Sequence, residues 1–94
     1  MQNDKLKAYR KKIDILDSIM AKTILRRNAV IKEIGKYKSS NGIKIKDNKR
    51  EKEILKNVKK YAKTNEDKKI LIEIYNKLLI HSKKEQERCS KRSK

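Results

Sequence analysis

The sequence predicts an all-α protein with three helices per chain, one very long, one medium and one medium-long, in an intertwined homodimer. The 94 residues contain no proline and only two glycines, so little in the chain interrupts a helix. Apolar residues also recur at steps of three and four along three segments, which is the period of a helix with one buried face. A chain of this length supports a single domain.

The first helix is expected to run from Asn3 or Asp4, both suitable N-caps, to about Lys38. Gly35 interrupts the helix propensity but not the apolar pattern, so we expect it to mark a close contact with another helix. The apolar stripe of this helix consists of Leu6, Tyr9, Ile13, Leu16, Met20, Ile24, Ile31 and Ile34.

Two shorter helices are expected to follow. The segment 39–42 (SSNG) predicts a turn, after which Asp47 is expected to cap a helix that ends near Ala62. A longer helix is expected from about Asp67 to residues 85–86. Residues 87–94 form a basic tail that we expect to be frayed, which leaves residues 1–86 as the functional domain.

Composition excludes several classes of protein. No apolar stretch approaches the roughly 20 residues of a membrane span, and the N-terminus lacks the apolar run of a signal peptide. Cys89 is the single cysteine, so it cannot form an internal disulfide, and it lacks metal-ligand spacing. We therefore expect a cytoplasmic protein with no membrane partner and no metal.

The net charge of +17 raises the question of a nucleic-acid partner. The basic residues are mostly lysines on every helix face, in pairs such as Lys59–Lys60 and Lys83–Lys84, and no aromatic platform accompanies them. We interpret them as a solvated surface and consider a nucleic-acid partner the weaker interpretation. A field this positive attracts small anionic substrates in either case.

Four polar residues stand where the helical pattern calls for apolar ones. At about 100° per residue, Arg27 and Lys38 fall inside the stripe of the first helix. Glu51 falls on the stripe of the second helix, and Ser82 falls on that of the third. Because an unpaired buried cation is costly, these residues predict a site for an anionic ligand in the core of the bundle.

The length of the first helix predicts a dimer. A helix of about 35 residues is roughly 50 Å long, whereas a compact chain of this size has a radius of gyration of only about 12 Å. The helix must therefore bury its stripe against another chain, most simply in a two-fold dimer. Arg10 lies at the edge of the stripe, roughly four to five turns from Arg27, so we expect it to reach the site of the partner chain.

Taken together, these residues and their neighbours resemble the all-helical class of chorismate mutases. The resemblance covers about residues 5–86, and its motifs are common singly but specific in this order and spacing. The matching segments are 10–17 (RKKIDILD), 26–27 (RR), 34–38 (IGKYK), 47–51 (DNKRE) and 82–86 (SKKEQ). The chain departs from the family in its very high lysine content and its basic tail.

The resemblance implies an isomerase that converts the dianion chorismate to prephenate for phenylalanine and tyrosine synthesis. The step is a concerted rearrangement, so no nucleophile, metal or cofactor is implied. The enzyme has to hold a reactive conformer and stabilise the charge that builds on the ether oxygen. The resemblance assigns that stabilisation to Lys38 and Gln86, with Arg27 and Glu51 as the other catalytic residues.

The resemblance also implies how the substrate is bound. Arg27 and Arg10 of the partner subunit match the arginines that clamp the two carboxylates, a task that suits the planar guanidinium. Glu51 and the backbone near Asp47 match the groups that read the ring hydroxyl. Arg50 would order this cluster, and Ser82 would contact a carboxylate.

Simpler interpretations stay open for most of these residues. Asp47 and Arg50 could form a helix cap and a surface ion pair, and Ser82 could be a helix-contact residue. Gln86 could be exposed, and Lys38 could serve the dipole at the end of its helix. Arg27 is the hardest to explain without a ligand.

Two other functions compete with the mutase. An isochorismate-pyruvate lyase shares this fold, but lyase relatives tend to lose the acidic residue that Glu51 supplies here. A basic helical dimer that binds nucleic acid belongs to a different class, and it leaves Glu51 on an apolar face unexplained.

Overall fold

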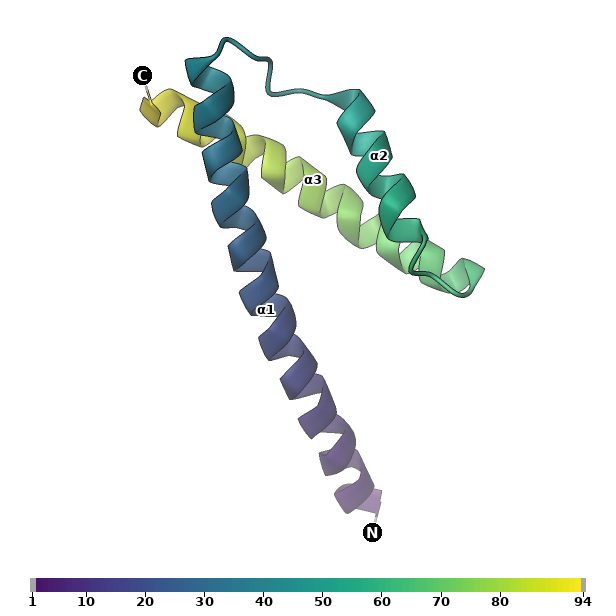
Figure 1. Ribbon diagram of the computed structural model, residues 1–94. Helices are drawn as coiled ribbons and strands as arrows, with labels where there is room; N and C mark the ends of the chain where they lie inside the picture. The colour runs from purple at the N-terminus through teal and green to yellow at the C-terminus, as the bar shows by residue number, and fades with distance from the viewer. Residues whose placement is uncertain (1, 94) are drawn as a thin grey trace. The chain divides into compact units, whose positions relative to one another are not determined.

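The computed structural model describes the backbone of residues 2–93 and the side chains of residues 3–91. Every regular element in that range is a helix (Figure 1): α1 (Gln2–Ser40), α2 (Asn48–Lys59) and α3 (Asn65–Ser93). The predicted all-α class and the three helices are confirmed. No helix in the described range is long and apolar enough to cross a membrane.

The chain divides into two compact units, one through Val30 and the other from Ile31 onward. The first unit is the N-terminal part of α1 alone. The second unit contains the last turns of α1 together with α2 and α3.

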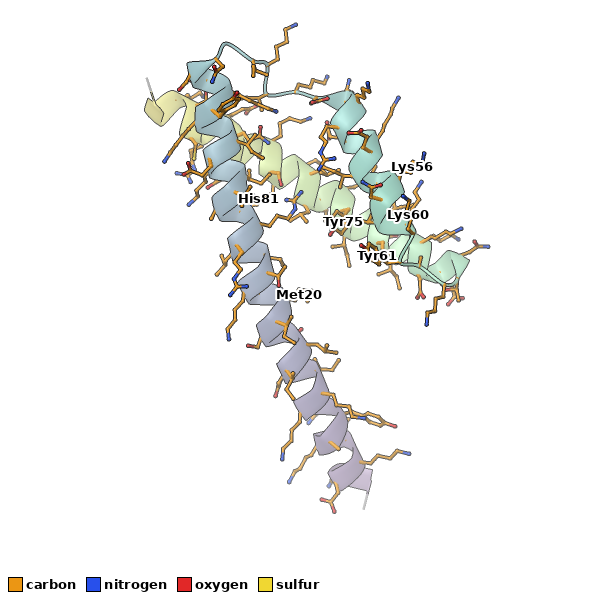
Figure 2. The ribbon with its side chains drawn as sticks, in the orientation of Figure 1. Met20, Lys56, Lys60, Tyr61, Tyr75 and His81 are labelled. Atoms are coloured by element: carbon orange, nitrogen blue, oxygen red, sulfur yellow. The ribbon has the colours of Figure 1, made fainter. Side chains whose placement is uncertain are left out.

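In the first unit the apolar stripe of α1 is exposed. The six predicted stripe residues of this unit are all open to solvent: Leu6, Tyr9, Ile13, Leu16, Met20 and Ile24. Met20 is labelled in Figure 2. The ring of Tyr9 has the ammonium groups of Lys5 and Lys12 at 6.0 and 5.8 Å from its centroid, a local contact on the same helix.

In the second unit α2 packs against α3, and the two helices lie side by side (Figure 1). Both begin at side-chain caps. Asp47 Oδ1 accepts a hydrogen bond from the Arg50 amide at 3.0 Å, and Thr64 Oγ1 accepts one from the Asp67 amide at 3.0 Å. The predicted N-cap role of Asp47 is confirmed.

The predicted helix ends differ from the observed ones. The second helix stops at Lys59 rather than near Ala62, because the next amides bond three residues back, as in Ala62 N to Lys59 O at 3.1 Å, which makes a tighter turn. The prediction that α3 ends at residues 85–86 is wrong, since the helix continues to Ser93 and Cys89 is buried. Residues 87–93 thus extend the helix, and Lys94 lies outside the described residues.

Gly35 marks a close helix contact, as predicted. A Cβ atom at this position would lie 2.8 Å from the Gln86 carbonyl oxygen and 2.9 Å from the Gln86 Cα. Since real Cβ atoms do not approach backbone that closely, only glycine lets the end of α1 lie directly on α3. This contact sets the position of Gln86.

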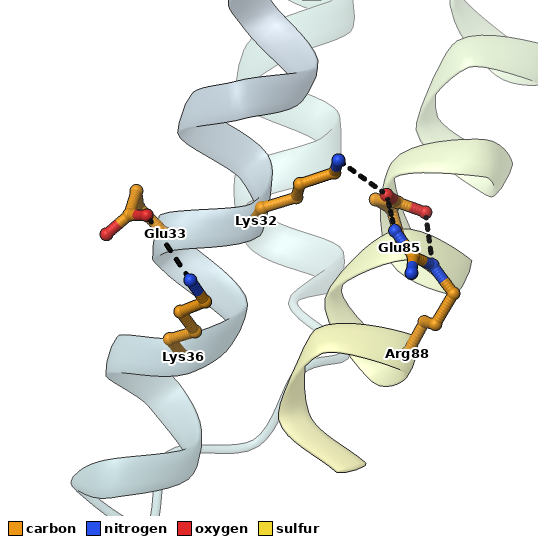
Figure 3. A network of polar contacts seen from close by, with 5 residues as sticks. All are labelled: Lys32, Glu33, Lys36, Glu85 and Arg88. Atoms are coloured by element: carbon orange, nitrogen blue, oxygen red, sulfur yellow. Dashed lines mark hydrogen bonds and ion pairs between the residues drawn. The ribbon is translucent and has the colours of Figure 1, made fainter. Parts of the chain in front are cut away.

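An ion network stabilises the same contact (Figure 3). The Glu85 side chain on α3 is only 11% exposed, and its carboxylate lies 3.7 Å from Lys32 Nζ on α1. Arg88 Nε donates to Glu85 Oε2 at 3.1 Å, and Arg88 Nη2 also contacts the carboxylate. The hydrogen bond to Glu85, together with its negative charge, raises the pKa of the Arg88 guanidinium.

Candidate functional site

The second unit holds a pocket between the end of α1, the following connection, the start of α2 and the C-terminal half of α3. Five of the residues predicted from the sequence meet there. The pocket is lined by Lys38, Ile45, Asp47, Arg50, Glu51, Lys83 and Gln86. It encloses about 60 Å³, well below the roughly 300 Å³ at which small-molecule pockets begin.

Lys38 is placed by the end of α1 and by the connection that follows. Its Nζ donates to the Ile45 carbonyl oxygen at 3.0 Å, and its own carbonyl accepts from the Ile43 amide at 2.8 Å. These bonds fold residues 43–45 back along the helix end. The half-buried ammonium is therefore held at the wall of the pocket.

Asp47, Arg50 and Glu51 come from the first turn of α2. The Asp47 side chain caps this helix, and its carbonyl accepts from the Glu51 amide at 3.1 Å. The Arg50 guanidinium lies 3.6 Å from Glu53 in an exposed ion pair. The cap and the surface ion pair that we considered as simpler roles are both present, although both residues also line the pocket.

The Glu51 side chain on α2 is directed toward α3 and is only partly exposed to solvent. Its Oε2 lies 3.7 Å from Lys83 Nζ, and the two side chains are 29% and 34% exposed. A carboxylate in the first turn also benefits from the positive end of the helix dipole.

Gln86 is the most informative member of the pocket. It is only 9% exposed, which rules out the interpretation of an exposed residue. Its Oε1 is buried and has no hydrogen-bond partner among the described residues. An unsatisfied buried polar atom costs about 1–3 kcal/mol, and because Oε1 can only accept, it calls for a hydrogen-bond donor that the described residues do not supply.

Ser82, Arg10 and Arg27 are not among the residues that line the pocket. Ser82 is buried, and its hydroxyl donates to the Leu78 carbonyl one turn earlier at 2.8 Å, as a helix-contact residue would. Arg10 and Arg27 belong to the first unit, where Arg10 is exposed and Arg27 is half-buried. The ligand contacts expected of these three residues stay predictions.

The sequence analysis missed Lys83, which it placed on a solvated face. The signal for it was present, since Lys83 follows the buried Leu79 by four residues and precedes Gln86 by three. These spacings put all three on one side of α3. His81, the single histidine, is exposed (Figure 2) and is not among the pocket residues.

The chemistry of the pocket favours an anion with additional polar groups. Three cationic side chains, Lys38, Arg50 and Lys83, outnumber the two carboxylates of Asp47 and Glu51. The amide of Gln86 supplies both a donor and an acceptor. No group of three or more His, Cys, Asp or Glu side chains that could hold a metal occurs within the described part of the chain.

A three-helix fold with such a pocket defines a small all-helical protein that binds a compact anionic ligand. Residues 9–87 match the protein family described as chorismate mutase type II. The chain is also 40% identical over 81 residues to a chorismate mutase of Methanocaldococcus jannaschii, which covers 85% of this chain and 82% of that protein. No solved structure matches with comparable significance.

The chain therefore belongs to the chorismate mutase type II family. It is an enzyme that isomerises chorismate to prephenate, and its substrate is chorismate. The predicted family and function are confirmed, and neither the lyase nor the nucleic-acid-binding dimer is favoured.

Proposed function

We propose that the pocket is part of an active site for chorismate that two copies of the chain complete together. The observation that carries this proposal is the convergence of Lys38, Glu51 and Gln86 on one small pocket, with Gln86 Oε1 buried and unpartnered.

In this proposal Lys38 and Gln86 stabilise the transition state. The bond to the ether oxygen breaks as the new carbon–carbon bond forms, and negative charge builds on that oxygen. A lysine ammonium has three donors, so Lys38 can keep its bond to the Ile45 carbonyl and still donate to the ether oxygen. The Nε2 group of the Gln86 amide, not its Oε1 atom, donates a second hydrogen bond there.

Glu51 reads the ring hydroxyl of chorismate as a hydrogen-bond acceptor. The Asp47 backbone lies within hydrogen-bonding distance of the Glu51 amide, so the two residues form one wall of the site. Arg50 stabilises this wall because its backbone amide, in the first turn of α2, donates to the Asp47 side chain. A neutral substitute for Glu51 would weaken the preference for the correct hydroxyl position.

The remaining contacts come from both chains. Arg27 of the same chain and Arg10 of the partner subunit bind the two carboxylates, and Ser82 of the same chain adds a contact to one of them. Two observations support a second chain: the stripe of the first unit is exposed, and the pocket is too small to enclose a substrate by itself. The buried apolar side chains of the described range are only Ile31, Leu79 and Cys89, which is little burial for a stable single chain.

A mixing experiment tests the shared site. Arg10→Ala and Lys38→Ala should each be inactive alone, because every site in either homodimer carries a lesion. When the two variants are unfolded together and refolded, half of the dimers are mixed, and one of the two sites in each mixed dimer is intact. We expect recovery of roughly a quarter of wild-type activity, measured as loss of chorismate absorbance.

The control is each variant refolded alone, which should stay inactive. Prephenate has to be identified as the product in the same assay, because pyruvate would indicate the lyase reaction. No recovery in a sample that contains mixed dimers would place Arg10 outside the partner's site.

The cytoplasmic location and the domain boundary at residue 86 also stay predictions.

A further inference from the structure

We propose that Lys83 is a positioning residue of this active site. Its ammonium group holds the Glu51 carboxylate in place and offsets its charge toward the dianionic substrate. The inference rests on the proposed role of Glu51, and it assigns a function to a lysine outside the set of residues that the family resemblance implied.

The contact joins two helices across the pocket. Lys83 Nζ on α3 lies 3.7 Å from Glu51 Oε2 on α2, and both residues line the pocket. About a third of each side chain is exposed, so the pair is shielded from water more than a surface ion pair is. The carboxylate therefore has a defined direction before a ligand arrives.

The other cations of the pocket have different partners. Lys38 Nζ donates to the Ile45 carbonyl, and the Arg50 guanidinium lies beside Glu53 on the surface of α2. Asp47 uses Oδ1 to cap its helix. Lys83 is thus the cation that the described structure pairs with Glu51.

The charge balance shows why such a partner is needed. Lys38, Arg50 and Lys83 face Asp47 and Glu51, which gives the pocket a formal charge of +1 (three cations minus two anions). Without Lys83 the balance falls to zero, and Glu51 loses its ion-pair partner while it still presents a negative charge to a dianion. Like charges this close oppose binding.

The test compares Lys83→Met with Lys84→Met by steady-state kinetics on the dimer. Lys84 is exposed, adjacent in sequence and absent from the pocket lining, so its loss removes the same charge without removing the ion pair. We expect Lys83→Met to raise KM for chorismate about tenfold with kcat within about threefold, and Lys84→Met to change KM less than about twofold. Lys83→Arg should restore most of the wild-type KM.

One further measurement separates positioning from direct contact with the substrate. In a Glu51→Gln background, Lys83→Met should have little further effect, since no carboxylate remains to be held.

Each other outcome overturns the inference. An equal loss with and without Glu51 would mean that Lys83 binds the substrate itself. A similar KM increase in Lys84→Met would mean that only net charge matters. An unchanged KM in Lys83→Met would mean that the ion pair does not contribute to substrate binding. Full activity of Glu51→Gln alone would instead defeat the proposed role of Glu51, and the inference would fall with it.

Discussion

The two units of this chain contain the same helical pattern and bury it to very different extents. Along α1 the apolar stripe continues from the first unit into the second, where Ile31 is buried and Ile34 is 37% exposed. In the first unit every stripe residue is open to solvent, and Leu16 is 57% exposed. An apolar period therefore predicts that a face will be covered, but it does not say whether the same chain or another chain covers it.

The largest expected effect comes from a charge on the uncovered stripe. Leu16→Asp should give a monomer with no detectable activity, because the dimer would have to bury two carboxylates in an apolar interface. Size-exclusion chromatography with light scattering, followed by the chorismate assay, measures both effects.

Leu25→Asp is the matched control. Leu25 is 69% exposed, belongs to the same unit and lies about 180° around the helix from Leu16. We expect this variant to stay dimeric and active. Equal tolerance of both substitutions would show that the stripe is not an interface, and that the first unit has no covering partner.

The next effect concerns the second unit, which we expect to supply the hydrogen bond to the breaking ether. A glutamine amide donates at every ordinary pH, whereas a carboxyl donates only when it is protonated. Gln86→Glu should therefore keep activity in acid and lose about 100-fold or more as the pH rises through the pKa of the new carboxyl. Wild-type turnover should vary little across the neutral range.

Turnover of both proteins from about pH 4.5 to 8.5 measures this difference. Gln86→Leu serves as the control, because it donates at no pH and should be equally inactive throughout. A profile of Gln86→Glu that runs parallel to the wild type would show that residue 86 does not face the reacting oxygen.

The smallest expected effect compares the two glycines. Gly35→Ala should destabilise the fold by about 1–3 kcal/mol, because the new Cβ has to push Gln86 away. Gly42 has a φ of 63° and open space around it, so Gly42→Ala should cost about 1–2 kcal/mol through backbone strain alone.

Urea unfolding and kcat together separate the two variants. Both should unfold more easily, but only Gly35→Ala should lower kcat, since only that glycine sets the position of Gln86. Equal kcat values would mean that α3 absorbs the displacement without moving the amide.

Local signals predicted local structure well. The sequence predicts Asp47 as a helix cap because a carboxylate just before a helix can accept a hydrogen bond from a free amide of the first turn. It predicts Gly35 as a close contact because the apolar stripe continues on both sides of this glycine. The end of α3 was mispredicted for a related reason. The basic composition of residues 87–93 indicates fraying, whereas the buried Cys89 and the ion pair of Arg88 with Glu85 continue the helix.

Of the four polar residues that break an apolar stripe, Lys38 and Glu51 line the pocket, whereas Arg27 and Ser82 do not. Gln86, which also lines the pocket, was identified through the family resemblance, because the spacing on each helix says nothing about how the helices pack. Lys83 was missed because lysines occur on every face of this chain, so one more lysine carries no signal by itself. The role of Lys83 depends on its ion pair with the Glu51 carboxylate, and Glu51 is 32 positions earlier in the chain.

The sequence by itself determined the helices, their caps, the stripe that calls for a partner, and the family, because these depend on residue order and on periods of a few residues. Only the tertiary structure decided which groups share the pocket, that Gln86 Oε1 is buried without a hydrogen-bond partner among the described residues, and that Lys83 pairs with Glu51. The physical reason is distance along the chain. Hydrogen bonds within a helix join residues four apart, whereas the pocket is made by docking α1, α2 and α3 on one another, and that arrangement depends on contacts such as Gly35 against Gln86.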